Sequence, residues 1–274
     1  MRKCLPNVIE TDLLQVPRCS SRSGYSLCEM NAELFEAVER DDKLPVLRFL
    51  EKEGDVNTRD EYGDKTLLMI ACLRNSKNIV YLLVTNSAAV NETSIRRCTP
   101  LMMAARKGNE DIVELLLKAK DIDVIAKNSW GMTAIHHAAR CNYATILEKL
   151  LSFPVPVDIV DIENRTPLWF AASCGYLSCV DVLLKRGANP LHESKTQNSP
   201  LEIAKQNGYT HVVEKMEEAI RVTSHPYVEG YMSVIRQQDQ QKVCRPSLQL
   251  SSLQQLVVCF TSCVCVCIDC WIAE

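Results

Sequence analysis

The 274-residue sequence has few aromatic residues (6%), only nine glycines and a net charge of only −3. The small negative charge argues against a protein that coats nucleic acid, because such proteins carry a large excess of Lys and Arg. Nine Gly and 11 Pro exclude collagen-like and low-complexity chains. With 47% hydrophobic residues the chain can bury a real core, and its length predicts one or two globular domains.

Motifs of the common catalytic sites are also missing. The sequence contains no G-x-G-x-x-G, P-loop, G-x-S-x-G or H-E-x-x-H pattern. His136 and His137 are adjacent, but consecutive residues of a helix point about 100° apart, so they are not interpreted as a metal-binding pair. We therefore expect no enzyme: no catalytic residue, no metal site, no cofactor and no small-molecule substrate.

The N-terminal segment, residues 1–30, contains no long apolar stretch, because residues such as Pro6 and Glu10 interrupt it. This pattern argues against a secretory signal peptide. Eight of the 14 cysteines are scattered between Cys4 and Cys179 without paired spacing, which favours a reducing compartment over a disulfide framework. We expect a cytoplasmic protein, and a nuclear location stays open.

One short pattern recurs five times at intervals of 33 or 34 residues. It starts with Thr or Ser, continues with large apolar residues and in most copies ends in two small residues: Thr66–Cys72, Thr99–Ala105, Thr133–Ala139, Thr166–Ala172 and Ser199–Lys205. The hydroxyl is typical of a helix N-cap, and the Pro that often follows suits the first helical position. A second apolar block, typical of an amphipathic helix, starts thirteen residues after each hydroxyl. One such helix pair cannot bury its apolar face, whereas a stack of pairs can.

The ends of the helices are also marked. Gly or Asn stands nine residues after each Thr or Ser, where a left-handed residue would end the first helix: Asn75, Gly108, Asn142, Gly175 and Gly208. A Gly-Ala turn follows the second helix at Gly187–Ala188 but is lost at Ser87–Ala88, Lys120–Asp121 and 154–156. We expect irregular loops at these three places.

The combined T-P-L-x-x-A-A, Gly, I-V-x-L-L and G-A-x-P pattern, with its 33-residue period, resembles the ankyrin repeat. The resemblance covers roughly residues 31–220 and implies an all-α solenoid of stacked helix-turn-helix units with hairpin loops. It divides into about six units: 31–62, 63–96, 97–130, 131–163, 164–196 and 197–220. The first and last units carry extra charge, which is typical of capping repeats.

Proteins of this family typically bind another protein through the hairpin fingers and the exposed side of the first helices, which form a concave face. Carried over to this sequence, the candidate partner-binding residues are Tyr62, Arg74, Arg96, Arg97, Arg106, Lys107, Lys127, Trp130 and Arg140. The basic members are grouped in the middle copies with only Glu92 nearby, at a finger base. This grouping favours an acidic peptide as the partner, either extended or helical. Trp130 is the best single anchor, because Trp and Arg dominate binding hot spots. The alternatives are a merely solvated charged face and a Trp130 that packs against its own finger.

The period ends near residue 221. Residues 221–255 are interpreted as a polar linker and 256–274 as a Cys-rich apolar tail. Fifteen of the eighteen residues 256–273 are apolar, the lower limit for a membrane span, and Asp269 counts against one. Cys263, Cys265 and Cys267 could instead hold a soft metal, or the tail could have no role of its own.

These features predict a non-catalytic scaffold or adaptor that binds another protein, with nucleic acid an improbable partner. A membrane-tethered scaffold that uses the tail is the first alternative. The second is the substrate-recognition subunit of a ubiquitin ligase, because residues 246–248 are weakly similar to the start of a SOCS box.

Overall fold

The computed structural model describes residues 27–223. The chain divides into two units, residues 1–220 and 221–274, and the helices of the described residues lie in the first unit apart from the end of the last one. Most of the predicted N-terminal segment 1–30 and of the linker 221–255, and the whole tail 256–274, lie outside the described residues.

Residues 27–223 form twelve helices, and strand pairing there is limited to one isolated bridge between Arg59 and Thr66. The helices are α1 (Leu27–Glu39), α2 (Lys43–Glu51), α3 (Leu67–Arg74), α4 (Lys77–Thr85), α5 (Pro100–Lys107), α6 (Glu110–Leu117), α7 (Ala134–Arg140), α8 (Ala144–Leu150), α9 (Pro167–Cys174), α10 (Leu177–Lys185), α11 (Pro200–Gln206) and α12 (Thr210–Thr223). The all-α repeat solenoid is confirmed. Helix α1 begins four residues before the predicted first unit, and α12 ends three residues beyond residue 220.

The predicted start and stop signals of the inner helices take the expected geometry. Thr66, Thr99, Thr166 and Ser199 each accept a hydrogen bond from the backbone N–H three residues later, at 3.2–3.4 Å. The Gly or Asn nine residues after each hydroxyl has a positive φ of 63–79° in every copy. Residues that the sequence analysis identified therefore mark both the start and the end of these short inner helices.

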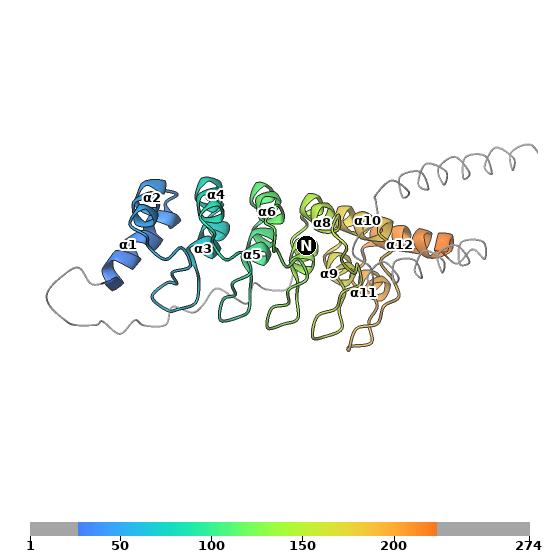
Figure 1. Cartoon of the computed structure of the whole chain (residues 1–274). Coiled ribbons are helices and arrows are strands. Elements are labelled where there is room, and N and C mark those ends of the chain that lie inside the picture. Colours follow the sequence, from blue (N-terminus) through green and yellow to red (C-terminus); the bar gives the residue numbers. More distant parts are fainter. Residues whose placement is uncertain (1–26, 224–274) are drawn as a thin grey trace, which may run out of the picture. The chain divides into compact units, whose positions relative to one another are not determined.

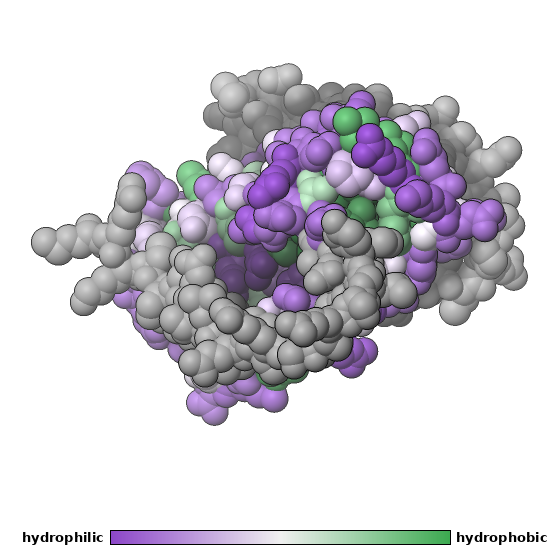
Figure 2. All heavy atoms as spheres, turned by 90° about the vertical axis from the view of Figure 1, so that its left-hand side faces the viewer, coloured by the Kyte–Doolittle hydropathy of each residue, from purple (hydrophilic) through white to green (hydrophobic). Residues whose placement is uncertain are grey.

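The helices form two layers (Figure 1). The odd-numbered inner helices pack in a row from α1 to α11, and the even-numbered outer helices pack in a second row from α2 to α10. Each inner helix from α1 to α9 also packs on the outer helix that follows it. Seen from the end that carries α1 and α2, the visible atoms of the described residues are mostly hydrophilic, with hydrophobic side chains among them (Figure 2).

The core lies between the two layers and between successive repeats. The paired small residues of the inner helices are fully buried: Ala71, Cys72, Ala104, Ala105, Ala138, Ala139, Ala171 and Ala172. Because their side chains are short, the next inner helix can approach closely. The outer helices contribute one buried stripe each, such as Ile112, Val113 and Leu116 in α6.

Hairpin loops connect each outer helix to the next inner helix, and we call them finger 1 (57–65), finger 2 (91–98), finger 3 (125–132), finger 4 (158–165) and finger 5 (191–198). Figure 1 shows them projecting on the side opposite the outer helices. A short polar side chain closes the turn of each finger through a hydrogen bond to its own backbone: Asp60, Ser94, Asn128, Asp161 and Ser194. The fingers are thus defined turns held by specific side chains.

Neighbouring fingers are joined by backbone hydrogen bonds. Ser129 N donates to Arg96 O at 3.0 Å, Ile162 N to Trp130 O at 3.0 Å and Lys195 N to Glu163 O at 2.9 Å. Between fingers 1 and 2 the acceptor is a side chain instead, because Ile95 N donates to Asp64 Oδ1 at 2.7 Å. The fingers therefore form one continuous edge.

The prediction of an irregular loop at Ser87–Ala88 is wrong. Ser87 adopts a φ of 63°, and the Ala88 N–H donates to the Leu83 carbonyl at 3.0 Å. The regular turn has the same geometry, with a positive φ at Gly187 and a bond from Ala188 N to Leu183 O. A serine thus takes the left-handed position of a glycine, and the turn is kept. The loops at 118–123 and 152–156 do depart from this geometry, since these described stretches contain no residue with a positive φ.

Candidate partner-binding face

The predicted binding residues fall into two groups on the side of the stack that carries the fingers. Tyr62, Arg96, Arg97, Lys127 and Trp130 lie in fingers 1 to 3. The others lie in the last turns of inner helices: Arg74 in α3, Arg106 and Lys107 in α5, and Arg140 in α7. We call the fingers and these helix ends together the finger face.

The fingers present a row of exposed apolar side chains. The exposed fraction is 60% for Tyr62, 72% for Ile95, 37% for Trp130 and 48% for Ile162. Ile95 and Ile162 were not among the predicted binding residues. The sequence does hold a signal for them, because Tyr62, Ile95 and Ile162 each stand four residues before the capping Thr of the following helix.

Trp130 is held by both neighbouring fingers. The guanidinium carbon of Arg96 in finger 2 lies 5.6 Å from the centre of the Trp130 ring, within the range of a cation–π contact. On the other side, the Trp130 carbonyl accepts the Ile162 N–H of finger 4. The indole therefore packs beneath a residue of the preceding finger, a contact that its own finger could not provide.

Arg97 occupies a strained backbone position. Its φ is 57°, and the equivalent positions of the other fingers, all left-handed, are taken by Gly63, Gly131, Asn164 and Gln197. A left-handed conformation costs an ordinary L-residue about 1–2 kcal/mol, and Gly avoids this cost. Arg97 is exposed and forms no ion pair within residues 27–223, so its side chain gains no such contact there. Its backbone N–H donates to the Ser94 carbonyl at 2.7 Å.

The basic residues at the inner-helix ends differ in their partners. Arg74 forms an ion pair with Glu39 of α1 at 2.8 Å. Because Glu39 lies 35 residues earlier in the chain, the sequence analysis did not identify it as a partner. By contrast, Arg106, Lys107 and Arg140 form no ion pair in the part of the chain that the structure describes. Glu92, the acidic group expected nearby, is bound to Arg59 at 2.5 Å.

Arg106 and Arg140 converge on the same two groups. Burial, together with the nearby Arg140 and Arg106 charges, lowers the pKa of His137 to about 3. Burial raises the pKa of the Cys141 thiol, while Arg140 and Arg106 act in the opposite direction. Both arginines therefore lie near His137 and Cys141. Two cations from successive repeats, neither of them ion-paired among the described residues, thus lie near the same groups on the finger face.

The outer helices show the opposite arrangement, because their charges are paired between repeats. Lys77 binds Asp111 at 2.9 Å, and Lys149 binds Glu114 at 2.9 Å and Glu110 at 3.2 Å. Hydrogen bonds from Lys149 and Lys118 lower the pKa of the Glu114 carboxyl to about 2. Lys77 and Lys149 of the central outer helices are thus paired with carboxylates, whereas Arg106, Lys107 and Arg140 are not. Lys43 and Arg48 of α2 also form no ion pair among the described residues.

Finger 4 is held more rigidly than its surface position suggests. The Asp161 side chain is fully buried, accepts the N–H groups of Glu163 and Arg165 at 2.9 Å, and forms an ion pair with the Arg165 guanidinium at 2.6 Å. That guanidinium also lies 5.4 Å from the Trp169 ring and 4.9 Å from the Phe170 ring. The base of the finger is therefore fixed on α9.

The adjacent histidines are structural. His136 Nδ1 accepts the Thr133 N–H at 3.1 Å, and its Nε2 lies 3.2 Å from the Arg165 carbonyl of the next repeat. Burial lowers the pKa of His136 to about 4. The charges that face it are those of Asp161, which raises the pKa, and of Lys127 and Arg165, which lower it. A buried neutral imidazole that bridges two repeats stabilises the stack.

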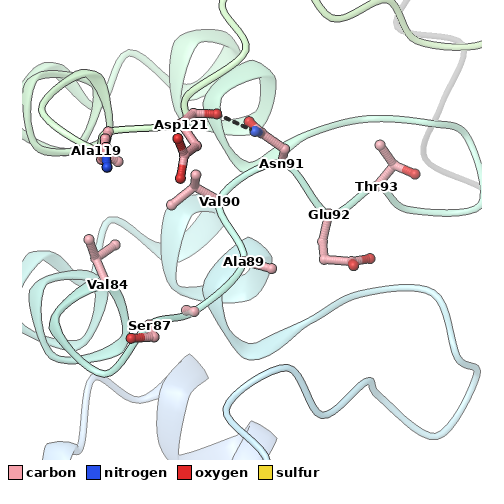
Figure 3. A pocket seen from close by; sticks show the side chains of 11 residues that line it. Val84, Ser87, Ala89, Val90, Asn91, Glu92, Thr93, Ala119 and Asp121 are labelled. Atoms are coloured by element: carbon pink, nitrogen blue, oxygen red, sulfur yellow. Dashed lines mark hydrogen bonds between the residues drawn. The ribbon is translucent and has the colours of Figure 1, made fainter.

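A hollow of about 770 Å³ opens between the C-terminal ends of α4 and α6 (Figure 3). Val84, residues 87–93 and residues 119–121 line it, and Asn91 Nδ2 crosses it to donate to the Asp121 carbonyl at 2.5 Å. None of the predicted binding residues lines the hollow. It lies where the irregular Lys120–Asp121 loop departs from the regular turn, and it has no cluster of unpaired polar groups to hold a ligand.

Two further properties concern residues 27–223 alone. No group of three or more His, Cys, Asp or Glu side chains is placed to hold a metal ion. None of the helices there is long and apolar enough to cross a bilayer. The predicted alternatives that use residues 256–273 concern a segment outside this range.

Comparison with known proteins agrees with the repeat architecture. A family model described as ankyrin repeats (3 copies) matches residues 34–128 and 121–194. The tyrosine-protein kinase Shark of Drosophila melanogaster is 34% identical over 62% of this chain and 18% of its own length. The ankyrin repeat and KH domain-containing protein mask-1 of Caenorhabditis elegans is 30% identical over 57% of this chain and 6% of its own length.

A third relative is the putative ankyrin repeat protein FPV031 of Fowlpox virus (strain NVSL), 34% identical over 57% of this chain and 48% of its own length. The chain thus spans less than half of the length of each of these relatives. What they share with it is the repeat region.

Proposed function

The chain belongs to the ankyrin-repeat family, and from this premise we propose that it is a non-catalytic cytoplasmic scaffold or adaptor that binds an acidic segment of another protein on the finger face. Ankyrin repeats are protein-interaction modules, so a protein partner follows from the family. The acidic character of the partner and the site are the parts proposed.

One observation carries the proposal: lysines of the central outer helices are ion-paired, whereas Arg106 and Lys107 at the end of α5 form no ion pair among the described residues. Lys77, Lys118 and Lys149 each lie against a carboxylate of their own or a neighbouring repeat. Arg106 and Lys107 have no such partner among the described residues. Acidic side chains of a partner protein would supply the missing carboxylates. Charge pairing of this kind mainly raises the association rate and the specificity of binding.

Fluorescence anisotropy with a labelled acidic peptide tests this proposal. The probe is a 16-residue peptide rich in Asp and Glu with interspersed Leu, and a second peptide carries Asn and Gln in place of the acids. Arg106→Glu/Lys107→Glu should weaken binding of the acidic peptide at least tenfold, because two attractive contacts become repulsive. Rising salt should weaken it further.

The matched control, Lys118→Glu/Lys185→Glu, reverses the charge of two lysines on the outer face. Its net charge therefore changes by the same amount as that of Arg106→Glu/Lys107→Glu. This control should bind the acidic peptide within twofold of the wild type. Equal binding by the Arg106/Lys107 variant and the control, or equal binding of the acidic and amide peptides, would refute the proposed site.

The membrane-tethered and ubiquitin-ligase alternatives depend on residues 244–274 and remain predictions. Cell fractionation of the full chain with and without these residues distinguishes a tethered scaffold from an untethered one. Stoichiometric co-purification of a catalytic subunit would favour the ligase alternative.

A further inference from the structure

We propose that the finger edge selects an extended partner segment in which a large apolar residue recurs at every third position, with acidic residues between. This inference rests on the proposed function and specifies the conformation and the side-chain pattern of the segment. Its starting point is the apolar row of Tyr62, Ile95, Trp130 and Ile162.

The backbone hydrogen bonds between fingers fix the spacing of this row. Each finger contributes two chain segments to the edge, and Ser129 N–Arg96 O and Ile162 N–Trp130 O join successive fingers at 3.0 Å. Hydrogen-bonded chain segments lie about 4.8 Å apart, so one finger follows the next at roughly 10 Å. Each of fingers 1 to 4 carries one large apolar side chain, at the second position after the turn-closing residue in Tyr62 and Trp130 and at the first in Ile95 and Ile162. One apolar side chain therefore recurs per finger, at about that interval.

An extended chain of the polyproline II type matches this interval. It has three residues per turn and rises about 3.1 Å per residue, so residues i, i+3 and i+6 lie on one side at about 9.3 Å spacing. A helix with a continuous apolar stripe presents residues i, i+3 or i+4 and i+7, about 5–6 Å apart. This spacing is about half of the distance between fingers, so every second apolar residue of such a helix would face a gap between two fingers. A strand with alternating side chains repeats about every 6.6 Å and loses register after one finger.

The charges along the edge set where the acidic residues belong. Finger 1 carries Asp60 and Glu61, whereas fingers 2 and 3 carry Arg96, Arg97 and Lys127. The acids of the segment should therefore lie beside Ile95 and Trp130 rather than at the Tyr62 end. The left-handed Arg97, strained and without an ion pair in the described chain, lies next to this central part.

Three peptides of identical composition test the pattern on the full chain by fluorescence anisotropy. The first has Leu at positions i, i+3 and i+6, the second at i, i+2 and i+4, and the third, helix-forming, at i, i+4 and i+8, which recur about every 6 Å along a helix, with the same acids at the other positions. The first should bind at least tenfold more tightly than the other two. Equal affinities, or tighter binding of the helical peptide, would overturn the extended mode.

Variants of the row locate the effect. Ile95→Ser/Ile162→Ser should reduce the advantage of the first peptide to within threefold, because the apolar contacts that read the spacing are gone. Tyr81→Ser is the control, since Tyr81 of α4 is also highly exposed, at 62%, but lies on an outer helix. An unchanged advantage in the double variant contradicts the inference.

The same measurements separate this inference from the proposed function. If all three peptides bind equally but lose affinity in Arg106→Glu/Lys107→Glu, the acidic site stands and the periodicity is wrong. If neither pair of substitutions affects binding, both proposals fail.

Discussion

The side-chain amide nitrogen of Asn128 lies 3.3 Å from Nε2 of the buried His137. The Asn128 carbonyl oxygen already accepts the backbone N–H groups of Trp130 and Met132, each at 2.9 Å, so the amide nitrogen must face the imidazole. Nε2 therefore acts as the acceptor, and His137 must be neutral. One contact thus ties the finger that carries Trp130 to the inner helix α7.

This arrangement predicts that the domain loses stability as the pH falls below about 6.5. His136 and His137 have pKa values lowered to about 4 and about 3, so only the unfolded chain takes up protons as the pH falls from 6.5. Stability is complete above pH 6.5 and is lost progressively down to the folded-state values. By pH 4 the loss is on the order of 3 kcal/mol for each imidazole.

Urea denaturation between pH 5 and pH 6 measures this effect. The wild type should show a slope equivalent to about two protons, and His137→Leu a slope of about one. His211→Gln is the control, because the His211 side chain is 85% exposed. An unaltered slope in His137→Leu would show that this imidazole is not kept neutral by the fold.

Gly131→Ala should destabilise the domain by about 2 kcal/mol, because two costs act at this position. The φ of 72° disfavours any L-residue, and an added Cβ would lie 2.8 Å from the Ile162 backbone nitrogen of finger 4. Gly187→Ala has only the backbone strain of a positive φ, since an added Cβ there would meet no atom within 4 Å. Denaturant titration should rank the loss as Gly131→Ala above Gly187→Ala, and equal losses would contradict the close approach of fingers 3 and 4.

Arg97→Gly should stabilise the folded state by up to about 1 kcal/mol while weakening binding of the acidic peptide. Glycine relieves the strain of the left-handed backbone, and loss of the guanidinium removes a cation from the finger edge. Arg97→Ala removes the same charge but keeps the strain, so it should weaken binding without stabilising. If both variants bind like the wild type, Arg97 has no role in recognition.

Asp161→Ala should cost about 3 kcal/mol, because it leaves the Arg165 guanidinium without its buried partner and opens the turn of finger 4. Lys149→Ala breaks two ion pairs of the outer face whose carboxylates are nearly half exposed, and it should cost less than about 1 kcal/mol. Thermal and urea denaturation compare the two. Similar costs for both would show that burial of Asp161 does not determine the strength of its ion pair.

The sequence allowed the repeat register to be predicted because its signals are local. A hydroxyl that caps a helix, a proline that follows it and a Gly or Asn that ends it act within one helix turn, so their positions alone locate α3, α5, α7, α9 and α11. The buried pairs of small residues, such as Ala104 and Ala105, follow from the same register. The turn at Ser87 was missed because serine does not favour a left-handed backbone. In the fold the next residue, Ala88, is buried and its N–H bonds the Leu83 carbonyl, which keeps the turn.

The binding residues were predicted less completely, because their environment depends on contacts between repeats. Position along the chain identifies Arg74 and Arg106 as equivalent residues, yet only the fold shows that Arg74 meets Glu39 while Arg106 lacks an ion pair among the described residues. Ile95 carried a periodic signal that was not used. Its 72% exposure is a result of the finger geometry.

The sequence by itself thus determined the family, the helix pairs and their order, because helix caps and apolar periodicity act over a few neighbouring residues. Only the tertiary structure decided which charges are paired, how Trp130 is held beneath Arg96 and why His137 is neutral. Those properties arise between residues some 30 positions apart or from complete burial, where the free energy of a charge or a ring depends on what surrounds it in space.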